Sequence, residues 1–408
     1  MMKRMMRALI ETMACVLWLP VLACASLACR SATPARPRVG WGPVPLKPIA
    51  YNSKALQAVG TASTTFVDET YSINDRSDFD DHLTNGPLDW RRFVPGLPRT
   101  LRFVRFLRTC DVLVTNFDGG LLRNSPLRFL EHWLLKAGNK KLVLWPYGAD
   151  SFVYTSISDH TFRYGLHQSY PGGARREKEV QRQIAHFTKH ADFVVANIPH
   201  HEALPRWDVL TVACYGIDTE EWKPAPDFRH VGDGHKAPVR LLHCPNHRDV
   251  KGTQFIIDAV ARLRAAGVNV ELRILEGVKN HEILAEMRQC DIVVAQLLYG
   301  YASTEIEGMS LGKPVISNLD SPVYYPTARR YTYFRECPLV SATPETLGAV
   351  LLNLVKHPDE RMRLGQSGRA YVRKFHSLEG QGRFWSTVVR STFHPDAPPV
   401  SQWWLDER

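Results

Sequence analysis

The sequence predicts an α/β protein with two domains, each a parallel sheet flanked by helices, followed by a helical tail. Its 408 residues exceed the length of one typical domain. Hydrophobic residues make up 44% and charged residues 23%, which is ordinary usage for a globular protein with a sizeable core. Short apolar runs alternate with stretches of helical spacing, a pattern typical of parallel sheets with helices on both faces. We therefore expect two Rossmann-like domains facing a cleft.

The first half carries this alternation from residue 39 onward. A helix over 126–137 begins with a proline and is followed by Gly138, and both are common at helix ends. Helical spacing also covers 52–59 and 177–189. The expected strands of this half are 39–41, 64–67, 111–115, 142–145, 193–196 and 209–213.

The alternation restarts after 222–238, a stretch rich in Pro, Gly, Asp and His that is typical of a linker. The expected strands of the second half are 240–244, 268–275, 291–295 and 314–317. The expected helices are 253–266, 282–289, 304–311, 344–356, 359–375 and 378–390.

Composition and missing motifs exclude several classes of function. The formal net charge is +10, which leaves open a plain basic surface, anionic lipid headgroups or anionic substrates. Nucleic acid is not expected, because no basic run is interleaved with aromatic residues. No C-x-x-C occurs among the eight cysteines, and the sixteen histidines show no spacing that indicates a metal site. The dinucleotide fingerprint and the P-loop are absent as well.

The first 30 residues allow three interpretations. Lys3, Arg4 and Arg7 precede an apolar run over 13–29, which has the form of a signal peptide or a short membrane anchor. At about 17 residues the run is marginal for a spanning helix. A disordered or spurious leader, an anchor and a cleaved signal all remain open.

Two segments of the second half carry residues suited to a nucleotide sugar. Arg248 and Lys251 lie in a loop after a predicted strand, where ligands of parallel sheets bind, and two cations there suit a diphosphate. Glu307 lies in E-G-M-S-L-G-K-P over 307–314 and suits ribose hydroxyls. Its helix begins near Ser303 and Thr304, whose backbone N–H groups form an anion site. The alternatives are a solvated basic turn and a Thr304–Glu307 capping box.

These segments resemble a known family. R-x-x-K-G over 248–252, E-G-M-S-L-G-K-P over 307–314, Y-G-I-D over 215–218 and G-x-x-G-R over 365–369 are similar to motifs of the family 4 retaining glycosyltransferases, which have the GT-B fold. The resemblance implies that Arg248 and Lys251 bind the donor diphosphate and that Glu307 binds the ribose. It implies a nucleoside-diphosphate sugar as donor substrate, with no cofactor and no metal.

The chain departs from the family pattern at two places. Tyr299 stands where the family has a first glutamate, so contact with the donor sugar passes to Glu305 or to backbone near Gly300. The second departure is Y-G-A-D over 147–150, where the family commonly has a histidine at the end of a first-domain strand.

Further candidates lie in the first half. Gly42 follows the first strand, where a glycine lets backbone approach a phosphate, although a plain tight turn is an equal reading. Four acceptor-side candidates follow later strands: Asn116, Asp118, Tyr147 and Asp150. Their alternatives are an ordinary Asp-Gly turn at 118–119 and a loop-holding role for Asp150.

The sequence therefore predicts a retaining glycosyltransferase that moves a sugar to a hydroxyl acceptor, a glycan or a lipid-linked molecule, in bacterial cell-surface glycan, glycolipid or polysaccharide biosynthesis. A nucleotide-sugar epimerase of GT-B architecture and a non-catalytic sugar-nucleotide-binding module are the alternatives. We expect a cytoplasmic protein, with peripheral membrane contact through its N-terminal segment left open. The expected segments are a disordered or membrane-associated leader (1–37), an acceptor-side domain (38–222), a linker (223–238), a nucleotide-sugar-binding domain (239–376) and a helical tail packing back on the first domain (377–408).

Overall fold

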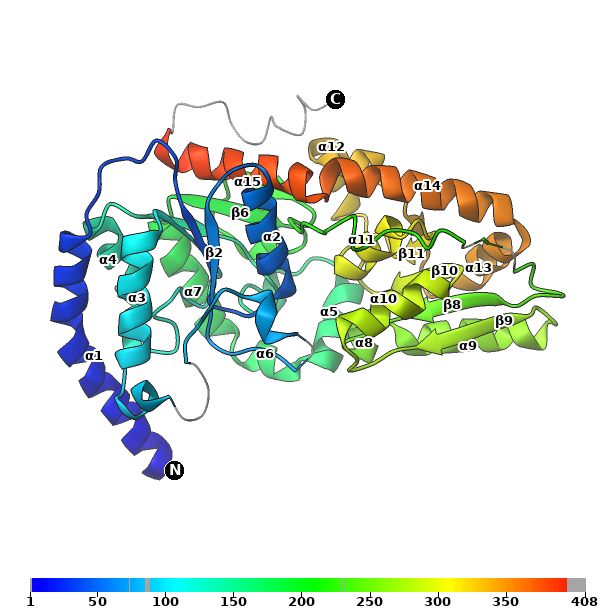
Figure 1. The fold of residues 1–408 in the computed structure, drawn as a ribbon. Coiled ribbons are helices and arrows are strands. Elements are labelled where there is room, and N and C mark those ends of the chain that lie inside the picture. The colour runs from blue at the N-terminus through cyan, green and yellow to red at the C-terminus, as the bar shows by residue number, and fades with distance from the viewer. Residues whose placement is uncertain (1, 73, 85–88, 228, 231, 395–408) are drawn as a thin grey trace. The chain divides into compact units, whose positions relative to one another are not determined.

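The computed structural model describes residues 2–72, 74–84, 89–227, 229–230 and 232–394 of the chain (Figure 1). Contacts divide the chain into two compact units. The first unit comprises Met1–Phe152, Lys178–Leu210 and Gly382–Arg408, and the second comprises Val153–Glu177 and Thr211–Gln381.

The first unit contains a seven-stranded sheet of order β3-β2-β1-β4-β5-β6-β7. Its strands are β1 (Val39–Trp41), β2 (Ser63–Val67), β3 (Asp81–His82), β4 (Val112–Thr115), β5 (Lys141–Leu144), β6 (Phe193–Asn197) and β7 (Val209–Thr211). Its helices are α1 (Met2–Ala28), α2 (Lys47–Ala58), α3 (Leu97–Thr109), α4 (Glu131–Ala137), α7 (Glu177–His190) and most of α15 (Leu378–Phe393). Every strand pair with a described register is parallel, as the strand–helix alternation predicts.

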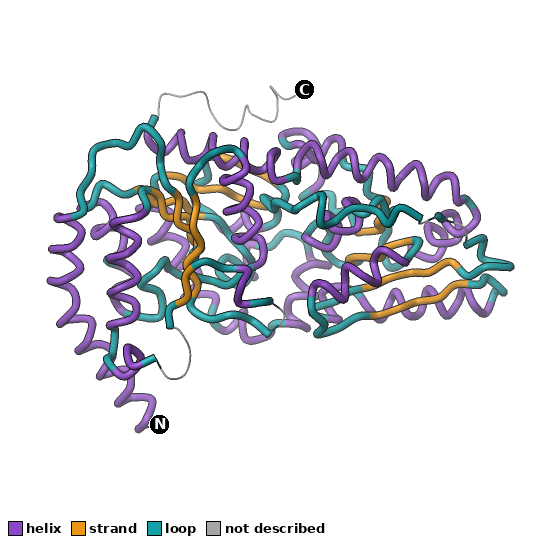
Figure 2. The backbone as a smooth tube through the Cα atoms, viewed as in Figure 1, coloured by secondary structure: helices purple, strands orange, loops and turns teal. Residues whose placement is uncertain are grey.

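The second unit contains a five-stranded parallel sheet of order β12-β11-β10-β8-β9. Its strands are β8 (Val239–His243), β9 (Val270–Ile274), β10 (Ile292–Gln296), β11 (Val315–Ser317) and β12 (Val340–Ser341). Its helices are α5 (His160–Ser169), α6 (Pro171–Arg175), α8 (Arg248–Lys251), α9 (Thr253–Ala265), α10 (Asn280–Gln289), α11 (Ser303–Ser310), α12 (Tyr325–Tyr331), α13 (Leu347–Lys356) and α14 (Pro358–Phe375). Figure 2 shows helices beside the strands of each sheet.

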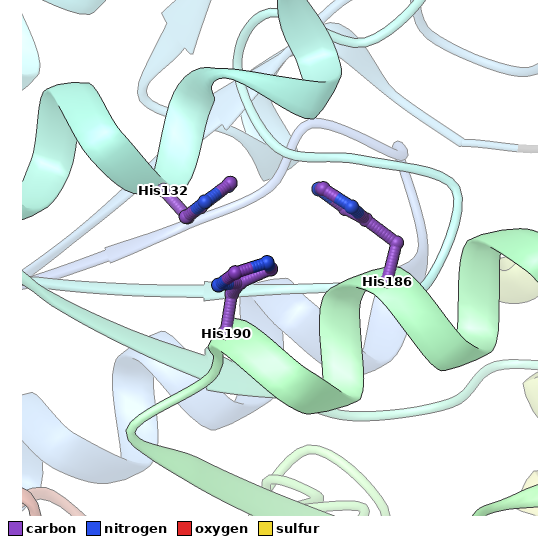
Figure 3. Close-up of side chains that lie close together, drawn as sticks. All are labelled: His132, His186 and His190. Carbon is purple, nitrogen blue, oxygen red and sulfur yellow. The ribbon is translucent and has the colours of Figure 1, made fainter.

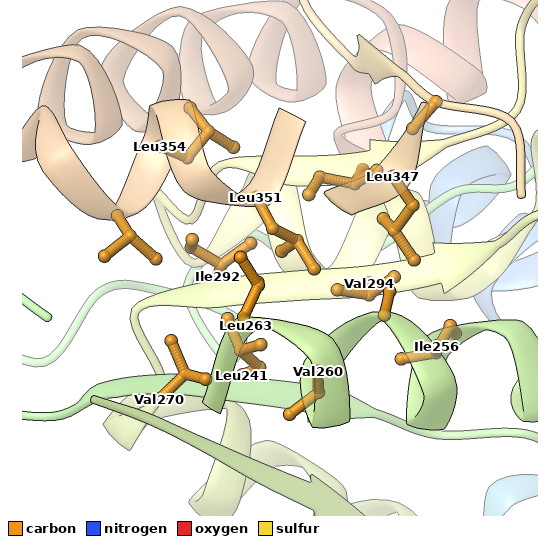
Figure 4. Packing of buried hydrophobic residues seen from close by; sticks show 14 of the residues in the cluster. Leu241, Ile256, Val260, Leu263, Val270, Ile292, Val294, Leu347, Leu351 and Leu354 are labelled. Carbon is orange, nitrogen blue, oxygen red and sulfur yellow. The ribbon is translucent and has the colours of Figure 1, made fainter. Parts of the chain in front are cut away.

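A buried aliphatic core fixes one face of the second sheet. Ile256 and Val260 of α9 and Leu351 of α13 pack against Leu241 and Val294 from the two central strands (Figure 4). All five side chains are at most 2% exposed, so each contributes on the order of 2 kcal/mol of burial free energy. This core holds the strands whose carboxyl ends carry the candidate donor-side residues.

The same aspartate device links neighbouring parallel strands in both units. In each case an aspartate just before a strand donates its N–H to one residue of the adjacent strand segment, and its carboxylate accepts the N–H of that same residue. For Asp192 and Leu142 both distances are 2.8 Å. The four pairs are Asp111 with Arg38, Asp192 with Leu142, Asp208 with Val194, and Asp291 with Arg240. The reciprocal pair satisfies backbone groups at the strand starts and fixes the register there.

The N-terminal segment, expected to be a disordered or membrane-associated leader over 1–37, is helical over most of its length. Residues 2–28 form α1, which lies alongside α3 and α4 (Figure 1). Leu22 and Ser26 are fully buried, and the Trp18 indole donates to the Pro95 carbonyl at 2.8 Å. Apolar contact with the first unit therefore accounts for part of the hydrophobic run. Among the described residues no helix is both long enough and apolar enough to cross a membrane.

The tail helix α15 contributes aromatic residues to the first unit. Trp385 is fully buried, with its ring 4.7 Å from that of Trp41 and 6.2 Å from that of Trp145. An added Cβ at Gly382 would lie 2.2 Å from the Ala55 carbonyl, so α15 approaches α2 closely. Residues 395–408 of the expected tail lie outside the described residues.

Several elements differ from the sequence-based expectation. The segment 153–177, which contains α5 and α6, belongs to the second unit by its contacts, although we expected the first domain to run without interruption over 38–222. Helix α3 was missed because arginines break up its apolar face, where Phe103, Phe106 and Leu107 are buried. The described residues of 223–238 contain no helix or strand, as a linker requires.

Replacing Asp192 tests the strand-linking device. Asp192→Ala leaves the Leu142 N–H without its side-chain acceptor and is expected to lower the free energy of unfolding by about 1–2 kcal/mol. Asp192→Asn keeps an acceptor oxygen and should cost less than the alanine change. Urea unfolding compares the three proteins, and hydrogen exchange at the Leu142 amide reports the site directly. Equal losses for both variants would contradict a role for the acceptor oxygen.

Candidate active site

The loop after β8 differs in form from the expected basic loop. Residues Arg248–Lys251 form the single-turn helix α8, and Gly252 follows with φ 73°, a left-handed conformation that favours glycine. A Cβ at Gly252 would also lie 3.0 Å from that of Leu297. Gly252 ends α8 and starts α9. Arg248 and Lys251 therefore project from a single helical turn at the carboxyl edge of the sheet.

Lys251 is a buried cation opposite two carboxylates. Its residue is 9% exposed, and burial lowers the pKa of its ammonium while attraction from Glu305 and Glu307 opposes that shift. A buried charge is costly unless opposite charge faces it, so the carboxylates of α11 stabilise the charged lysine. The Lys251 carbonyl accepts the Leu297 N–H at 3.1 Å, which joins the β8 and β10 loops. The structure thus brings together Lys251, Glu305 and Glu307.

The first turn of α11 is organised by Glu305 instead of Glu307. Helix α11 begins one residue earlier than expected, with Ala302 as its N-cap. The Glu305 carboxylate accepts the Ala302 N–H at 3.0 Å and the Ser317 hydroxyl at 2.9 Å. The alternative interpretation, a Thr304–Glu307 capping box, is therefore wrong. It fails because Thr304 lies inside the helix, at the second helical position.

This shift changes the roles of the acidic pair. Glu305 is fully buried and also accepts the Gln296 amide at 2.8 Å, so its hydrogen bonds are internal. Glu307 is half-buried on the same helix and faces Lys251 electrostatically. Ser303 and Thr304 occupy the first two helical positions, where N–H groups point out of the helix start.

Arg248 and Lys251 have different partners: Arg248 pairs with Glu276, whereas Lys251 faces Glu305 and Glu307. Its exposed guanidinium forms a two-point ion pair with Glu276, with distances of 2.8 and 2.7 Å. The pair raises the pKa of Arg248 and lowers that of Glu276. Glu276 follows β9 at the same sheet edge and was missed, because an isolated exposed acid gives no sequence signal.

Tyr299 and Gly300, both predicted donor-side residues, make packing contacts in the second unit. The Tyr299 ring packs against Phe162 of α5 at 4.5 Å, and a Cβ at Gly300 would lie 1.8 Å from the Asn318 carbonyl. The Gly300 carbonyl accepts the Ser317 hydroxyl at 3.0 Å. A cavity of about 10 Å³ beside Tyr299 and Tyr325 has room for roughly one water molecule.

The segment that contains α5 covers this region of the second unit. The Ser169 hydroxyl accepts the Val250 N–H at 3.0 Å, and Tyr170 contacts His247 with ring centres 4.5 Å apart. Gly165 allows close approach, since its added Cβ would be 3.2 Å from the Val250 backbone. Sequence reasoning missed this segment because helical spacing alone does not identify the packing partner.

Two residues of the resemblance motifs have packing roles. The Lys313 ammonium donates to the Arg288 and Cys290 carbonyls, both at 2.8 Å, and so closes the end of α10. Its burial lowers its pKa to about 8. A Cβ at Gly365 would lie 2.0 Å from the Gly312 carbonyl, so α14 packs directly on the end of α11. These positions orient the helix that carries Glu307.

Buried histidines complete the framework of the second unit. Both ring nitrogens of His243 are hydrogen-bonded, to the Val294 carbonyl at 2.7 Å and to the Thr253 hydroxyl at 2.9 Å. His376 similarly bonds the Tyr215 carbonyl and the Tyr301 hydroxyl. Their fully used nitrogens identify both as structural residues.

Two of the first-unit candidates hold loops together, and the other two belong to a partly exposed polar cluster. Buried Asp150 accepts the N–H groups of Phe117, Tyr147 and Gly148 at 2.9–3.1 Å. The Asn116 amide donates to the Trp145 carbonyl at 2.7 Å. Asp150 and Asn116 therefore join the β4 and β5 loops, which favours the loop-holding interpretation.

Asp118 and Tyr147 belong to a polar cluster at these loops. Arg123 lies 3.3 Å from the Asp118 carboxylate and 3.8 Å from that of Asp68. Burial raises the pKa of Asp118, and burial with the nearby Asp118 and Asp150 raises that of Tyr147. Sequence reasoning missed Arg123 and Asp68, because their proximity depends on how the loops fold.

Gly42 has a conformational role. Its φ is 147°, and an added Cβ would lie 1.9 Å from the Phe66 carbonyl. Its N–H donates to the Val114 carbonyl at 3.1 Å. The tight-turn interpretation accounts for this glycine, and its N–H is already used within the first unit.

Glu131 is a buried carboxylate that the sequence did not single out. It accepts the N–H groups of Gly120, Leu121 and Leu122 at 2.7–3.3 Å. Burial raises its pKa to about 7. As the first residue of α4, it holds the loop that carries Asp118.

The combination of two parallel α/β units resembles solved glycosyltransferase structures. Anabaena Alr3699/HepE, crystallised with UDP-glucose, matches with a TM-score of 0.56 and 12% identity over 86% of this chain and 99% of that one. The chain has the GT-B fold. This GT-B protein also resembles WaaG, a glycosyltransferase involved in lipopolysaccharide biosynthesis, with a TM-score of 0.51, 13% identity and coverage of 86% and 99%.

A glycosyltransferase from Rickettsia africae gives a similar match, with a TM-score of 0.51 and 12% identity over 87% of this chain and 98% of that one. No protein-family model and no curated protein sequence matches the chain. At these identities the likeness establishes the GT-B fold, and any function rests on the residues of the site.

Asp150 gives a pH test of the first-unit loops. Burial raises its pKa to about 7 despite three N–H donors, whereas an unfolded aspartate titrates near 4. Between roughly pH 4 and 7 the folded chain holds a proton that the unfolded chain has released, so the stability contribution falls as pH rises. The difference in unfolding free energy between wild type and Asp150→Asn should therefore shrink across this window. A difference that widens or stays constant would contradict the assignment.

Proposed function

We propose that this GT-B protein is a glycosyltransferase that moves a sugar from a nucleoside-diphosphate sugar to a hydroxyl acceptor with retention of anomeric configuration. The observation that carries the proposal is the buried Lys251 facing Glu305 and Glu307 at the carboxyl edge of the second sheet. Ligands of parallel α/β sheets bind at this edge. A buried lysine whose charged form is favoured by two carboxylates suits a leaving diphosphate.

Each donor-side residue receives a distinct role in this proposal. Lys251 neutralises the departing diphosphate, assisted by N–H groups at Ser303 and Thr304 of α11. Glu307 accepts hydrogen bonds from the ribose hydroxyls. Glu305 acts indirectly, because its bonds to Ala302 and Ser317 hold α11 in place.

Arg248 joins the site through exchange of partners. Its ion pair with Glu276 is exposed on both sides, and exposed ion pairs contribute little. A diphosphate carries more charge than one carboxylate and accepts the same two-point contact. Donor binding is therefore proposed to draw Arg248 away from Glu276.

The acceptor hydroxyl is proposed to meet the cluster of Asp118, Tyr147 and Arg123 in the first unit. These side chains are partly exposed, while Asn116 and Asp150 are used in holding the loops. The donor's own phosphate is proposed to take the acceptor proton on the front face, as the resemblance to retaining enzymes implies. A glycan or lipid-linked acceptor fits this proposal.

A non-catalytic sugar-nucleotide-binding module is the second candidate. The observation that favours it is the Tyr299 ring packed against Phe162, where the family has a glutamate for the donor sugar. Donor binding without product from any acceptor would support this alternative. Interconversion of the donor without an acceptor would support an epimerase.

Lys251 provides the direct test of donor binding. Lys251→Met keeps the aliphatic stem and removes the charge, and Glu307→Gln removes the carboxylate. Each is expected to weaken UDP-glucose binding roughly 10- to 100-fold, because a charge-assisted hydrogen bond contributes about 1.5–3 kcal/mol. Calorimetry measures the affinity, and UDP release with sugar acceptors measures turnover. UDP-glucose is tested first because it was crystallised with HepE.

The matched control is Lys356→Ala, an exposed lysine at the end of α13. It should bind UDP-glucose like the wild type. Unchanged affinity in Lys251→Met would overturn the donor-site assignment. Because Lys251 is buried, equal melting temperatures of the unliganded proteins show that each variant remains folded.

We further propose peripheral contact with a bilayer that contains anionic lipids. Helix α1 buries Leu22 and Ser26 against the first unit but exposes an apolar stripe: Met13, Val16, Leu17, Val21 and Leu27, each 46–73% exposed. Lys3, Arg4 and Arg7 precede this stripe in the sequence, and the chain carries a net charge of +10. An apolar helix face near basic residues suits insertion between anionic headgroups.

Charged substitutions on α1 test this contact. Val16→Glu combined with Leu17→Glu should lower co-sedimentation with phosphatidylglycerol-containing vesicles roughly tenfold or more, because each burial contributes about 1.5–3 kcal/mol. Met362→Glu, at an exposed apolar position on α14, is the control and should bind like the wild type. Loss of a dimer instead of loss of vesicle binding would assign the stripe to a second copy of the chain.

A further inference from the structure

Three histidines gather in the first unit, and none of them is among the residues proposed above to contact donor or acceptor. His132 is the second residue of α4, and His186 and His190 are one turn apart on α7. One ring nitrogen from each can be chosen so that the three lie within 4.8 Å of one another. Figure 3 shows the rings converging from the two helices.

We propose that His132, His186 and His190 bind a transition metal ion of the Zn²⁺, Co²⁺, Ni²⁺ or Cu²⁺ class. Three imidazoles suit these borderline metals, whereas Mg²⁺ and Ca²⁺ require oxygen ligands. Three histidines with a fourth position for water also match a common zinc arrangement. The proposal is independent of the proposed transferase activity.

Three nitrogens of this cluster lack the well-formed hydrogen bonds that structural histidines have. Both ring nitrogens of His132 and Nε2 of His186 are buried, and none of them forms a hydrogen bond of normal geometry. By contrast, both nitrogens of His243 and of His376 are bonded. A buried polar atom without a partner costs free energy, and coordination to a metal would remove that cost.

The protonation state also favours metal binding. Burial lowers the pKa of His132 to about 4 and lowers those of His186 and His190, which favours the neutral rings that coordinate a metal. The Phe129 carbonyl opposes this shift for His132 and His186, while Lys136 and Lys189 reinforce it. Both lysines are exposed, so solvent screens their repulsion of a metal ion.

Small ring movements complete the coordination geometry. Tetrahedral Zn–N bonds of about 2.0–2.1 Å place ligand nitrogens roughly 3.3 Å apart. His132 and His190 are now stacked with centroids 3.7 Å apart and planes at 19°. His186 and His190 are half-buried, which leaves their rings space to rotate toward such positions. The Phe129–Phe187 contact at 6.1 Å holds the chain before α4 against α7.

Metal binding would have a structural consequence for the neighbouring loop. His132 follows Glu131, whose carboxylate holds the N–H groups of residues 120–122. A metal that joins α4 to α7 would therefore restrict the base of the loop that carries Asp118. The expected effect is stabilisation of the first unit.

Cobalt titration of the tag-free full chain, in a buffer free of chelators, tests the proposal. Tetrahedral Co²⁺ with nitrogen ligands gives a visible ligand-field absorption, which is expected to saturate at one ion per chain. Zn²⁺ should displace the Co²⁺ and raise the melting temperature. Losing the outer hydrogen-bond partner of a metal ligand lowers metal affinity roughly 10- to 100-fold. His186→Gln combined with His190→Gln removes two ligands, so it should weaken Co²⁺ binding by more than that.

His281→Gln, at an exposed histidine on α10, is the matched control and should bind like the wild type. Both substituted ligands are half-buried, and metal-free melting temperatures confirm that the variants fold. Absence of saturable one-to-one binding to the wild type would overturn the proposal regardless of any variant. Binding that is unchanged in the double variant would overturn it as well.

Discussion

Pairing of parallel strands depends on backbone groups that find partners at the strand starts. Four aspartates supply this constraint in both units, each by two hydrogen bonds to a single residue of the adjacent strand segment. Because side chains alternate faces along a strand, a slip of one residue would turn core residues to the opposite face. The aspartates thus fix the register on which the apolar core and the loop positions depend.

Buried carboxylates perform a related task at the opposite edges of the sheets. Glu131 and Asp150 each accept three backbone N–H groups, and Glu305 holds the first turn of α11. These loops would otherwise bury unpaired donors, which costs free energy. Acids that look like catalytic candidates in the sequence are therefore often the supports of a site. Glu307 is half-buried and faces Lys251, and it is the acid of α11 that the proposed function assigns to the donor.

The sequence located the elements of the second half closely, because its strands and helices have strong apolar patterns. It predicted the helix of Glu307 within one residue, yet that single residue changed the capping acid from Glu307 to Glu305. Lys251 was expected from its motif, whereas the ion pair between Arg248 and Glu276 was not. The histidine cluster was not expected, because His132 lies 54 positions before His186 in the chain and only folding brings it near His186 and His190.

The sequence by itself determined the α/β class and the order of strands and helices in the two units, because apolar periodicity and strand–helix order are local properties. The tertiary structure decided which polar groups remain available. Arg248 pairs with Glu276, and Asp150 is used by its loop, while Lys251 gains its carboxylate partners only when the β8 and β10 loops meet. Such pairings depend on distances between residues far apart in the chain, and local patterns carry no information about them.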